Sequence, residues 1–159
     1  MLNRDLVALV RRLLDESALP ARRLCPEITQ SALMLEPELA LRHLHELAAL
    51  GVKLSIDDYG SGQASLAYVK TLPVHELKIN RVFVDGVDTD AKNAAIVRST
   101  ILLCRELGLS VIAEGAETPA EEAWQKGNAC DQVQGYVVAR PMPLDDFLAW
   151  TAKRNGITA

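Results

Sequence analysis

Short apolar runs of strand length alternate along this chain with longer segments of helical periodicity, and this alternation most constrains the fold. Strands are predicted at 54–57, 76–80, 109–113 and 131–138. The connecting segments 64–71, 91–107 and 119–126 have helical patterns. A strand followed by a helix in units of about 25–30 residues favours a parallel sheet with right-handed crossovers. We therefore expect an α/β fold.

The segments before and after these units complete one predicted domain. Helices are expected at 5–17, 38–49 and 143–153, and residues 155–159 are expected to fray. Residues 23–29 resemble a strand that contains Pro26, and because proline cannot donate to a strand ladder we predict an edge strand. With 159 residues the chain suits a single core, so we assign residues 1–154 to one domain.

The composition narrows the possible partners and compartments. A net charge of −4 and the lack of a long basic run argue against binding to a nucleic acid polymer. No apolar run reaches about 18 residues, which argues against a membrane span. The three cysteines have no paired spacing, and we expect reduced thiols in a cytoplasmic protein.

Polar residues gather where the predicted strands end, and these are the strongest candidates for a site. They are Glu27, Asp57, Asp58, Lys78, Glu114 and Gln134. In (β/α) barrels and doubly wound sheets, the carboxyl ends of the strands are where sites are built. Adjacent carboxylates repel each other, and Mg²⁺ or Mn²⁺ would relieve that repulsion. Two such cations can cleave a phosphodiester.

Ordinary structural roles compete with this interpretation at each position. Asp57 and Asp58 could be a helix cap and a turn residue, and Lys78 could form a structural ion pair with Asp58. Glu27 could cap a loop, and Glu114 could accept backbone N–H groups. His43 and His45, two residues apart on one helix, are expected to be surface or partly packed residues.

The order of five short motifs resembles that of EAL domains. The motifs are Glu-Ile-Thr-Gln-Ser (27–31), Asp-Asp-Tyr-Gly-Ser-Gly (57–62), Leu-Lys-Ile-Asn (77–80), Ala-Glu-Gly-Ala-Glu-Thr (113–118) and Gln-Gly-Tyr-Val-Val-Ala-Arg-Pro (134–141). The resemblance implies a TIM-like barrel that hydrolyses cyclic di-GMP to linear pGpG with two metal ions.

The resemblance also implies roles for individual residues. Glu27, Asp57, Asp58 and Glu114 would bind Mg²⁺ or Mn²⁺, with Asp57 bridging the two ions. Lys78 would orient the attacking water, so that the catalytic set comprises Lys78, Asp58 and Glu114. The substrate side of the pocket would contain Glu117, Gln134, Arg140 and Pro141.

Several departures from the family pattern predict a partial barrel. The first two strands of the barrel, and the two metal ligands on the missing strands, have no counterpart in this sequence. Gln30 and Asn80 stand where the family has Glu and Asp, and Gln63 and Ala64 replace a Tyr-Ser pair. An incomplete barrel exposes a strand edge and apolar interior, so we expect a second copy or a partner protein to cover it.

Three functions are compatible with this pattern. The preferred hypothesis is a non-hydrolysing module of cyclic di-GMP signalling that binds the nucleotide or a protein. The alternative is an active phosphodiesterase that is completed by upstream sequence or by a partner chain. A gene fragment without a present function is the third possibility.

Overall fold

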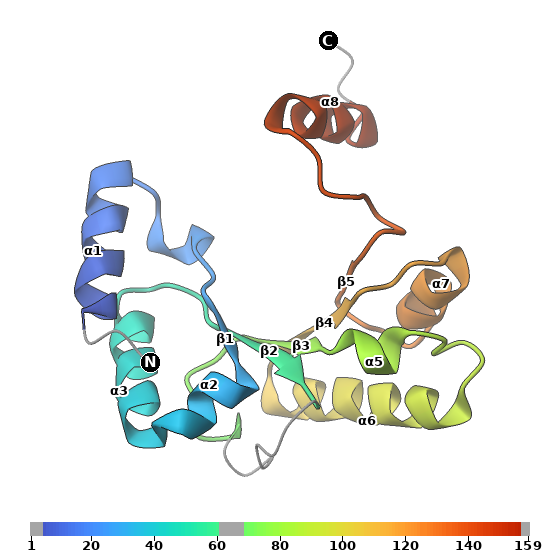
Figure 1. Ribbon diagram of the computed structural model, residues 1–159, viewed down its shortest axis with the longest axis horizontal. Coiled ribbons are helices and arrows are strands. Elements are labelled where there is room, and N and C mark those ends of the chain that lie inside the picture. Colours follow the sequence, from blue (N-terminus) through green and yellow to red (C-terminus); the bar gives the residue numbers. More distant parts are fainter. Residues whose placement is uncertain (1–4, 61–68, 157–159) are drawn as a thin grey trace.

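The protein, examined as a computed structural model that describes residues 5–60 and 69–156, contains a five-stranded parallel sheet (Figure 1). The strands follow the order β1-β2-β3-β4-β5, with every neighbouring pair parallel. Their bounds are β1 Glu27–Thr29, β2 Ser55–Tyr59, β3 Glu76–Ile79, β4 Ser110–Glu114 and β5 Gln132–Gln134. The expected α/β fold with a parallel sheet is confirmed.

Most of the helices lie where the sequence predicts them. The α-helices of the described residues are α1 Leu6–Ser17, α2 Gln30–Leu35, α3 Pro37–Ala49, α5 Arg81–Val84, α6 Ala91–Leu107, α7 Pro119–Gly127 and α8 Leu144–Arg154. The helix expected at 64–71 falls largely on 61–68, outside the described residues. The short helices α2 and α5 were not predicted from the apolar pattern. Each begins at a side-chain cap, Thr29 for α2 and Asn80 for α5.

Two predicted strands are shorter than the sequence suggested. Of the predicted edge strand 23–29, only Glu27–Thr29 pairs with β2, and Ala21–Arg23 forms a 3₁₀ helix after Pro20. The predicted strand 131–138 stops at Gln134. At Gly135 the backbone lies directly against the Ala116 backbone, which leaves no room for a Cβ, and the chain then turns away from the sheet.

The strand register divides the side chains of the sheet into an apolar and a polar face. Paired residues of neighbouring strands point to the same face, and successive residues alternate. The apolar face presents Ile28, Ile56, Leu77, Ile79, Val111, Ala113 and Val133. The polar face presents Glu27, Asp57, Lys78, Glu114 and Gln134, which are residues that the sequence singled out at the strand ends.

Helices cover the apolar face and form the core with it. One cluster packs the side chains of Leu54 and Ile56 against α3, and the other packs Leu77 and Val111 against α6. Burying each of these aliphatic side chains contributes about 1.5–3 kcal/mol relative to leaving it exposed. The core therefore fixes the strands from one side and leaves the polar face available for a site.

One expectation about the helix surface is wrong. His43 is buried, with 6% of its surface exposed, whereas His45 is exposed as predicted. The side chain of His43 lines an apolar cavity of about 290 Å³ between β1, α1 and α3. The apolar periodicity of one helix could not reveal this burial, because it does not show which part of α3 is covered by α1.

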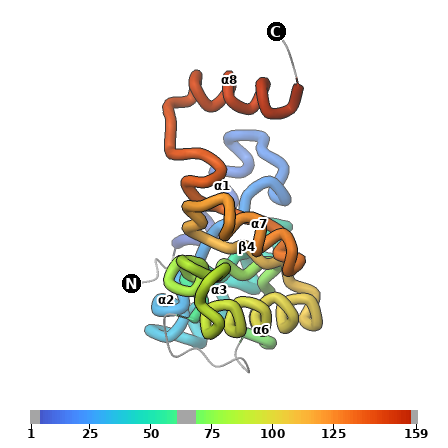
Figure 2. The backbone as a smooth tube through the Cα atoms, turned by 90° about the vertical axis from the view of Figure 1, so that its right-hand side faces the viewer, coloured from blue at the N-terminus to red at the C-terminus, as the bar shows by residue number. Residues whose placement is uncertain are grey.

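Helices α1 and α8 differ in how closely they pack on the rest of the structure. α1 packs on α3, while α8 lies at the end of an extended segment and is set apart from α3 and α6 (Figures 1 and 2). None of the α8 residues is buried. Within the described parts of the chain, no helix combines the length and apolar character needed to cross a membrane.

Candidate metal centre

The ammonium group of Lys78 lies at the centre of the polar face. Its Nζ donates to Glu27 Oε1 at 2.8 Å and to Glu114 Oε1 at 2.5 Å, and Asp57 Oδ1 lies 3.8 Å away. The three carboxylates come from β1, β2 and β4, and Lys78 itself belongs to β3. Only 3% of the Lys78 surface is exposed. A buried ammonium is therefore neutralised by carboxylates from three other strands of the sheet.

Burial and neighbouring charges shift the pKa values of Lys78 and Glu114. Burial alone would lower the pKa of Lys78, but its hydrogen bonds to Glu114 and Glu27 raise that pKa above the usual lysine value. Burial raises the pKa of Glu114, and the negative charge of Asp57 acts in the same direction, while Lys78 opposes both. A cation close to Asp57 and Glu114 would therefore stabilise the ionised form of these carboxylates.

A second set of contacts brings Asp58 into the same group. Carboxylate oxygens of Asp57, Asp58 and Glu114 all lie within 4.8 Å of one another. Asp58 has a φ of +58°, and its backbone N–H donates to Asp57 Oδ1 at 2.9 Å. This local turn places two consecutive carboxylates on one side, which regular strand alternation would have separated.

The donor set fits a hard divalent cation. Mg²⁺, Mn²⁺ and Ca²⁺ prefer carboxylate oxygens, and three side chains within this spacing could hold one such ion together with solvent or substrate oxygens. In the part of the chain that the structure describes, this is the one group of three His, Cys, Asp or Glu side chains whose ligand atoms lie this close together. Glu27 is held by Lys78 instead, and 48% of its side chain is exposed.

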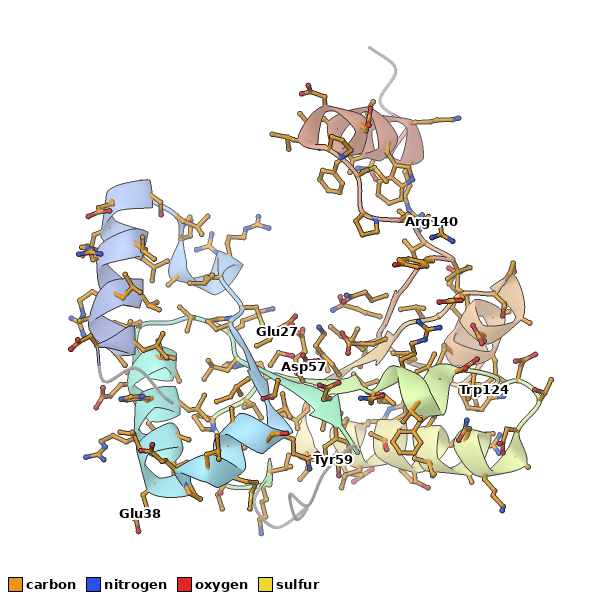
Figure 3. All side chains as sticks on the ribbon, viewed as in Figure 1. Glu27, Glu38, Asp57, Tyr59, Trp124 and Arg140 are labelled. Carbon is orange, nitrogen blue, oxygen red and sulfur yellow. The ribbon has the colours of Figure 1, made fainter. Side chains whose placement is uncertain are left out.

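The predicted substrate residues are less closely gathered. Glu117 pairs with Arg81 at 2.8 Å, just beyond Glu114, and Gln134 is aligned with Glu114 in the sheet. Arg140 and Pro141 lie on the extended segment before α8, where the Arg140 guanidinium stacks on Tyr136. Figure 3 shows Arg140 well away from Glu27 and Asp57. The structure thus brings together three of the four predicted metal ligands, Asp57, Asp58 and Glu114, but not all the predicted substrate contacts.

Sequence patterns missed one contributor to this region. Arg81 lies over Gly115, where a Cβ would come within 2.5 Å of its side chain, and from there it reaches Glu117. The glycine directly after Glu114 was the available signal, because a close approach by another side chain requires the absence of a Cβ. Arg81 adds a cation beside the acidic cluster.

Comparison with known proteins identifies the family. Residues 1–141 match the EAL domain family, so the chain belongs to that family. The bifunctional diguanylate cyclase/cyclic di-GMP phosphodiesterase MucR of Pseudomonas aeruginosa is 41% identical over 147 residues. That match covers 92% of this chain and 22% of MucR, so the chain corresponds to about a fifth of this relative's length.

Solved structures share the fold. The MucR phosphodiesterase in complex with cyclic di-GMP superposes with a TM-score of 0.86 at 39% identity, covering 91% of this chain and 59% of that one. The EAL domain of Mycobacterium smegmatis DcpA gives a TM-score of 0.89 at 32% identity, covering 96% and 69%. A manganese and cyclic di-GMP complex of Klebsiella pneumoniae BlrP1 gives 0.79 at 27% identity, covering 84% and 34%. These likenesses confirm the expected TIM-barrel-like EAL architecture.

The Lys78 cluster, which consists of Lys78 with Glu27, Asp57 and Glu114, should contribute measurably to stability. Replacement of Lys78 by methionine should lower the free energy of unfolding of the metal-free protein by about 2–3 kcal/mol, because three carboxylates then lose their shared counter-charge while remaining partly hydrated. Mn²⁺ should restore part of this loss by supplying positive charge to Asp57 and Glu114. Urea unfolding with and without Mn²⁺ measures both effects.

The matched control is Lys126→Met. Lys126 also forms a close ion pair, 2.6 Å from Glu122, but on the exposed surface of α7. Its loss should cost about 0.5 kcal/mol and show no response to Mn²⁺. Equal losses in the two variants would contradict the special role of the Lys78 cluster.

Proposed function

We propose that this chain is a module of cyclic di-GMP signalling that binds a divalent cation and the nucleotide at the Lys78 cluster, and that the isolated chain does not hydrolyse it. The observation that carries this proposal is the meeting of Asp57, Asp58 and Glu114 beside a buried lysine. The cyclic di-GMP complexes of its EAL relatives support the choice of ligand.

Each part of the cluster has a distinct task in this proposal. Asp57, Asp58 and Glu114 would hold Mg²⁺ or Mn²⁺, and the bound ion would polarise a phosphoryl oxygen as a Lewis acid. The Lys78 ammonium can donate to a phosphate oxygen as well as to its carboxylate partners. Arg81, already paired with Glu117, adds positive charge for an anionic ligand. The nucleotide would then lie over the polar face of the sheet.

The ligand set favours binding over turnover. Two-metal phosphodiester hydrolysis requires ligands for two cations about 4 Å apart. The described residues supply one three-carboxylate group, and Glu27 is engaged with Lys78 outside that group. Moreover, among the described strands, β1 has a neighbour on one side only, so Glu27 lies at the rim of the sheet. One cation and a bound nucleotide agree best with this arrangement.

Hydrolysis is the second candidate, and the retention of Glu27 and Lys78 at 2.8 Å favours it. An upstream segment or a partner chain that covers the open edge of β1 would add ligands beside Glu27. In that assembly the same residues would form one side of a phosphodiesterase site that releases pGpG.

A binding and turnover experiment tests the proposal. Calorimetry should show Mn²⁺ binding to the wild-type chain and cyclic di-GMP binding to its Mn²⁺-loaded form. Asp57→Asn should weaken Mn²⁺ binding by more than about 10-fold, since loss of even an outer-shell partner costs about 10–100-fold in metal affinity. Chromatography of the reaction mixture should show no pGpG.

The control for charge is Asp88→Asn, because Asp88 is exposed outside the cluster. It should bind Mn²⁺ as the wild type does. Formation of pGpG that disappears in Glu27→Ala would establish the hydrolytic alternative instead. Absence of both metal and nucleotide binding at millimolar concentrations would refute the proposal.

We also propose that a second copy of the chain covers its exposed apolar surfaces. Among the described strands, β5 pairs with β4 only, and an open hollow of about 540 Å³ beside it is lined by Tyr136, Phe147 and Trp150 from the extended segment and α8. Leu144 and Leu148 on α8 are also exposed. Exposed apolar side chains beside a strand that has one partner among the described strands favour self-association.

Light scattering after gel filtration tests this second proposal. The wild type should run as a dimer, and Leu148→Asp should shift it towards the monomer, because a charge enters the apolar contact. Leu102→Asp is the matched control, since Leu102 is equally exposed, 58% against 56%, but lies on α6. A wild-type monomer at high concentration would contradict the proposal.

A further inference from the structure

The side chain of Asn80 connects the candidate metal centre to the helix that follows β3. Its Nδ2 donates to Asp58 Oδ1 at 2.7 Å, and its Oδ1 accepts from the backbone N–H of Val82 at 2.8 Å. The second contact caps α5. One residue therefore anchors both a carboxylate of the cluster and the start of the next helix.

These two contacts define the orientation of the amide. A backbone N–H can only donate, so the Asn80 atom that faces Val82 must be the carbonyl oxygen. The amino group is then the one that faces Asp58. The contact with Asp58 is thus a hydrogen bond from a neutral donor to a carboxylate, which is stronger than a bond between two neutral groups.

Asp58 needs such an anchor. Its left-handed backbone conformation, with φ of +58°, is unfavourable for a residue with a side chain. The bond from its own N–H to Asp57 supports the turn, and the Asn80 amide fixes the side chain. Together they hold the Asp58 carboxylate in the space that it shares with Asp57 and Glu114.

We propose that Asn80 is a positioning residue for the divalent cation: its amide orients Asp58 towards the ion while adding no negative charge of its own. This inference rests on the proposed function, in which Asp57, Asp58 and Glu114 hold that ion. Asn80 itself makes no contact with the substrate in this account and acts through Asp58.

The chemistry of the position distinguishes asparagine from aspartate. A carboxylate at position 80 could still cap α5, but it has no N–H to donate to Asp58. Two carboxylate oxygens would then face each other where 2.7 Å now separates a donor from an acceptor. Their repulsion would destabilise the metal-free protein, and a divalent cation between them would remove the repulsion. Asparagine makes the centre less dependent on metal for its stability.

The decisive variant is Asn80→Ser, which keeps an oxygen for the α5 cap and removes the amide Nδ2 that donates to Asp58, because the serine hydroxyl is one bond shorter and serves as the cap acceptor. Titration with Mn²⁺, followed by electron paramagnetic resonance of the free ion, should show affinity reduced by about 10–100-fold, the range typical for loss of an outer-shell partner. The metal-free thermal midpoint should fall less than that of Asn80→Asp, because serine keeps the α5 cap and adds no charge beside Asp58.

Two further variants separate positioning from a general structural role. Asn128→Ala removes another asparagine contact, 2.8 Å to the carbonyl of Trp124, at a distance from the centre, and should leave Mn²⁺ affinity unchanged. Asn80→Asp should lower the metal-free midpoint and show a larger rise on addition of Mn²⁺ than the wild type.

The outcomes distinguish this inference from the function on which it rests. Wild-type Mn²⁺ affinity in Asn80→Ser would overturn the positioning role and leave the metal centre standing. No Mn²⁺ binding by the wild type would overturn both. If Asn80→Asp has a wild-type midpoint and an unchanged response to Mn²⁺, its carboxylate does not face Asp58 and the inference is wrong.

Discussion

The ion pairs of one buried lysine hold the functional face of this protein together. Lys78 carries positive charge into the middle of a parallel sheet, and Glu27, Asp57 and Glu114 reach it from three other strands. Without that charge the carboxylates of Glu27, Asp57 and Glu114 would repel one another. Breaking such a cluster leaves uncompensated charge. The ion pairs of Lys78 therefore disfavour any shift in the register of these four strands.

This arrangement depends on the division of the sheet into two faces. Apolar residues at alternate positions attach the strands to α3 and α6, and the intervening positions are then free to carry charge. The turn at Asp58 departs from the alternation, and the hydrogen bond from Asn80 secures that departure. A rigid apolar face thus supports a polar face whose charges suit a cation and an anionic ligand.

Much of the fold could be predicted because its signals are local. The long helix α6 begins at the Asp90 cap and ends at Gly108, as its sequence pattern indicates. The polar residues at strand ends likewise predicted the edge at which the carboxylates meet. The limits of β1 and β5 could not be predicted, because they depend on contacts such as that of Gly135 with Ala116.

The finer details of the site were also beyond sequence patterns. The sequence allowed Lys78 to pair with Asp58, whereas the structure gives it Glu27, Asp57 and Glu114 as ion-pair partners. It showed Asn80 as a departure from the family but not as a donor to Asp58. These contacts join residues that are brought together only by tertiary packing. Strand periodicity specifies faces, whereas partners within a face depend on side-chain length and backbone turns.

The most direct test is to locate the cation itself. Crystals grown with Mn²⁺ and measured near the manganese absorption edge should give an anomalous peak about 2.0–2.6 Å from oxygens of Asp57, Asp58 and Glu114. A peak there would establish the centre on which the account depends. The account would be contradicted by crystals in which manganese binds only at surface carboxylates such as Asp145 and Asp146, while Lys78 keeps its three partners.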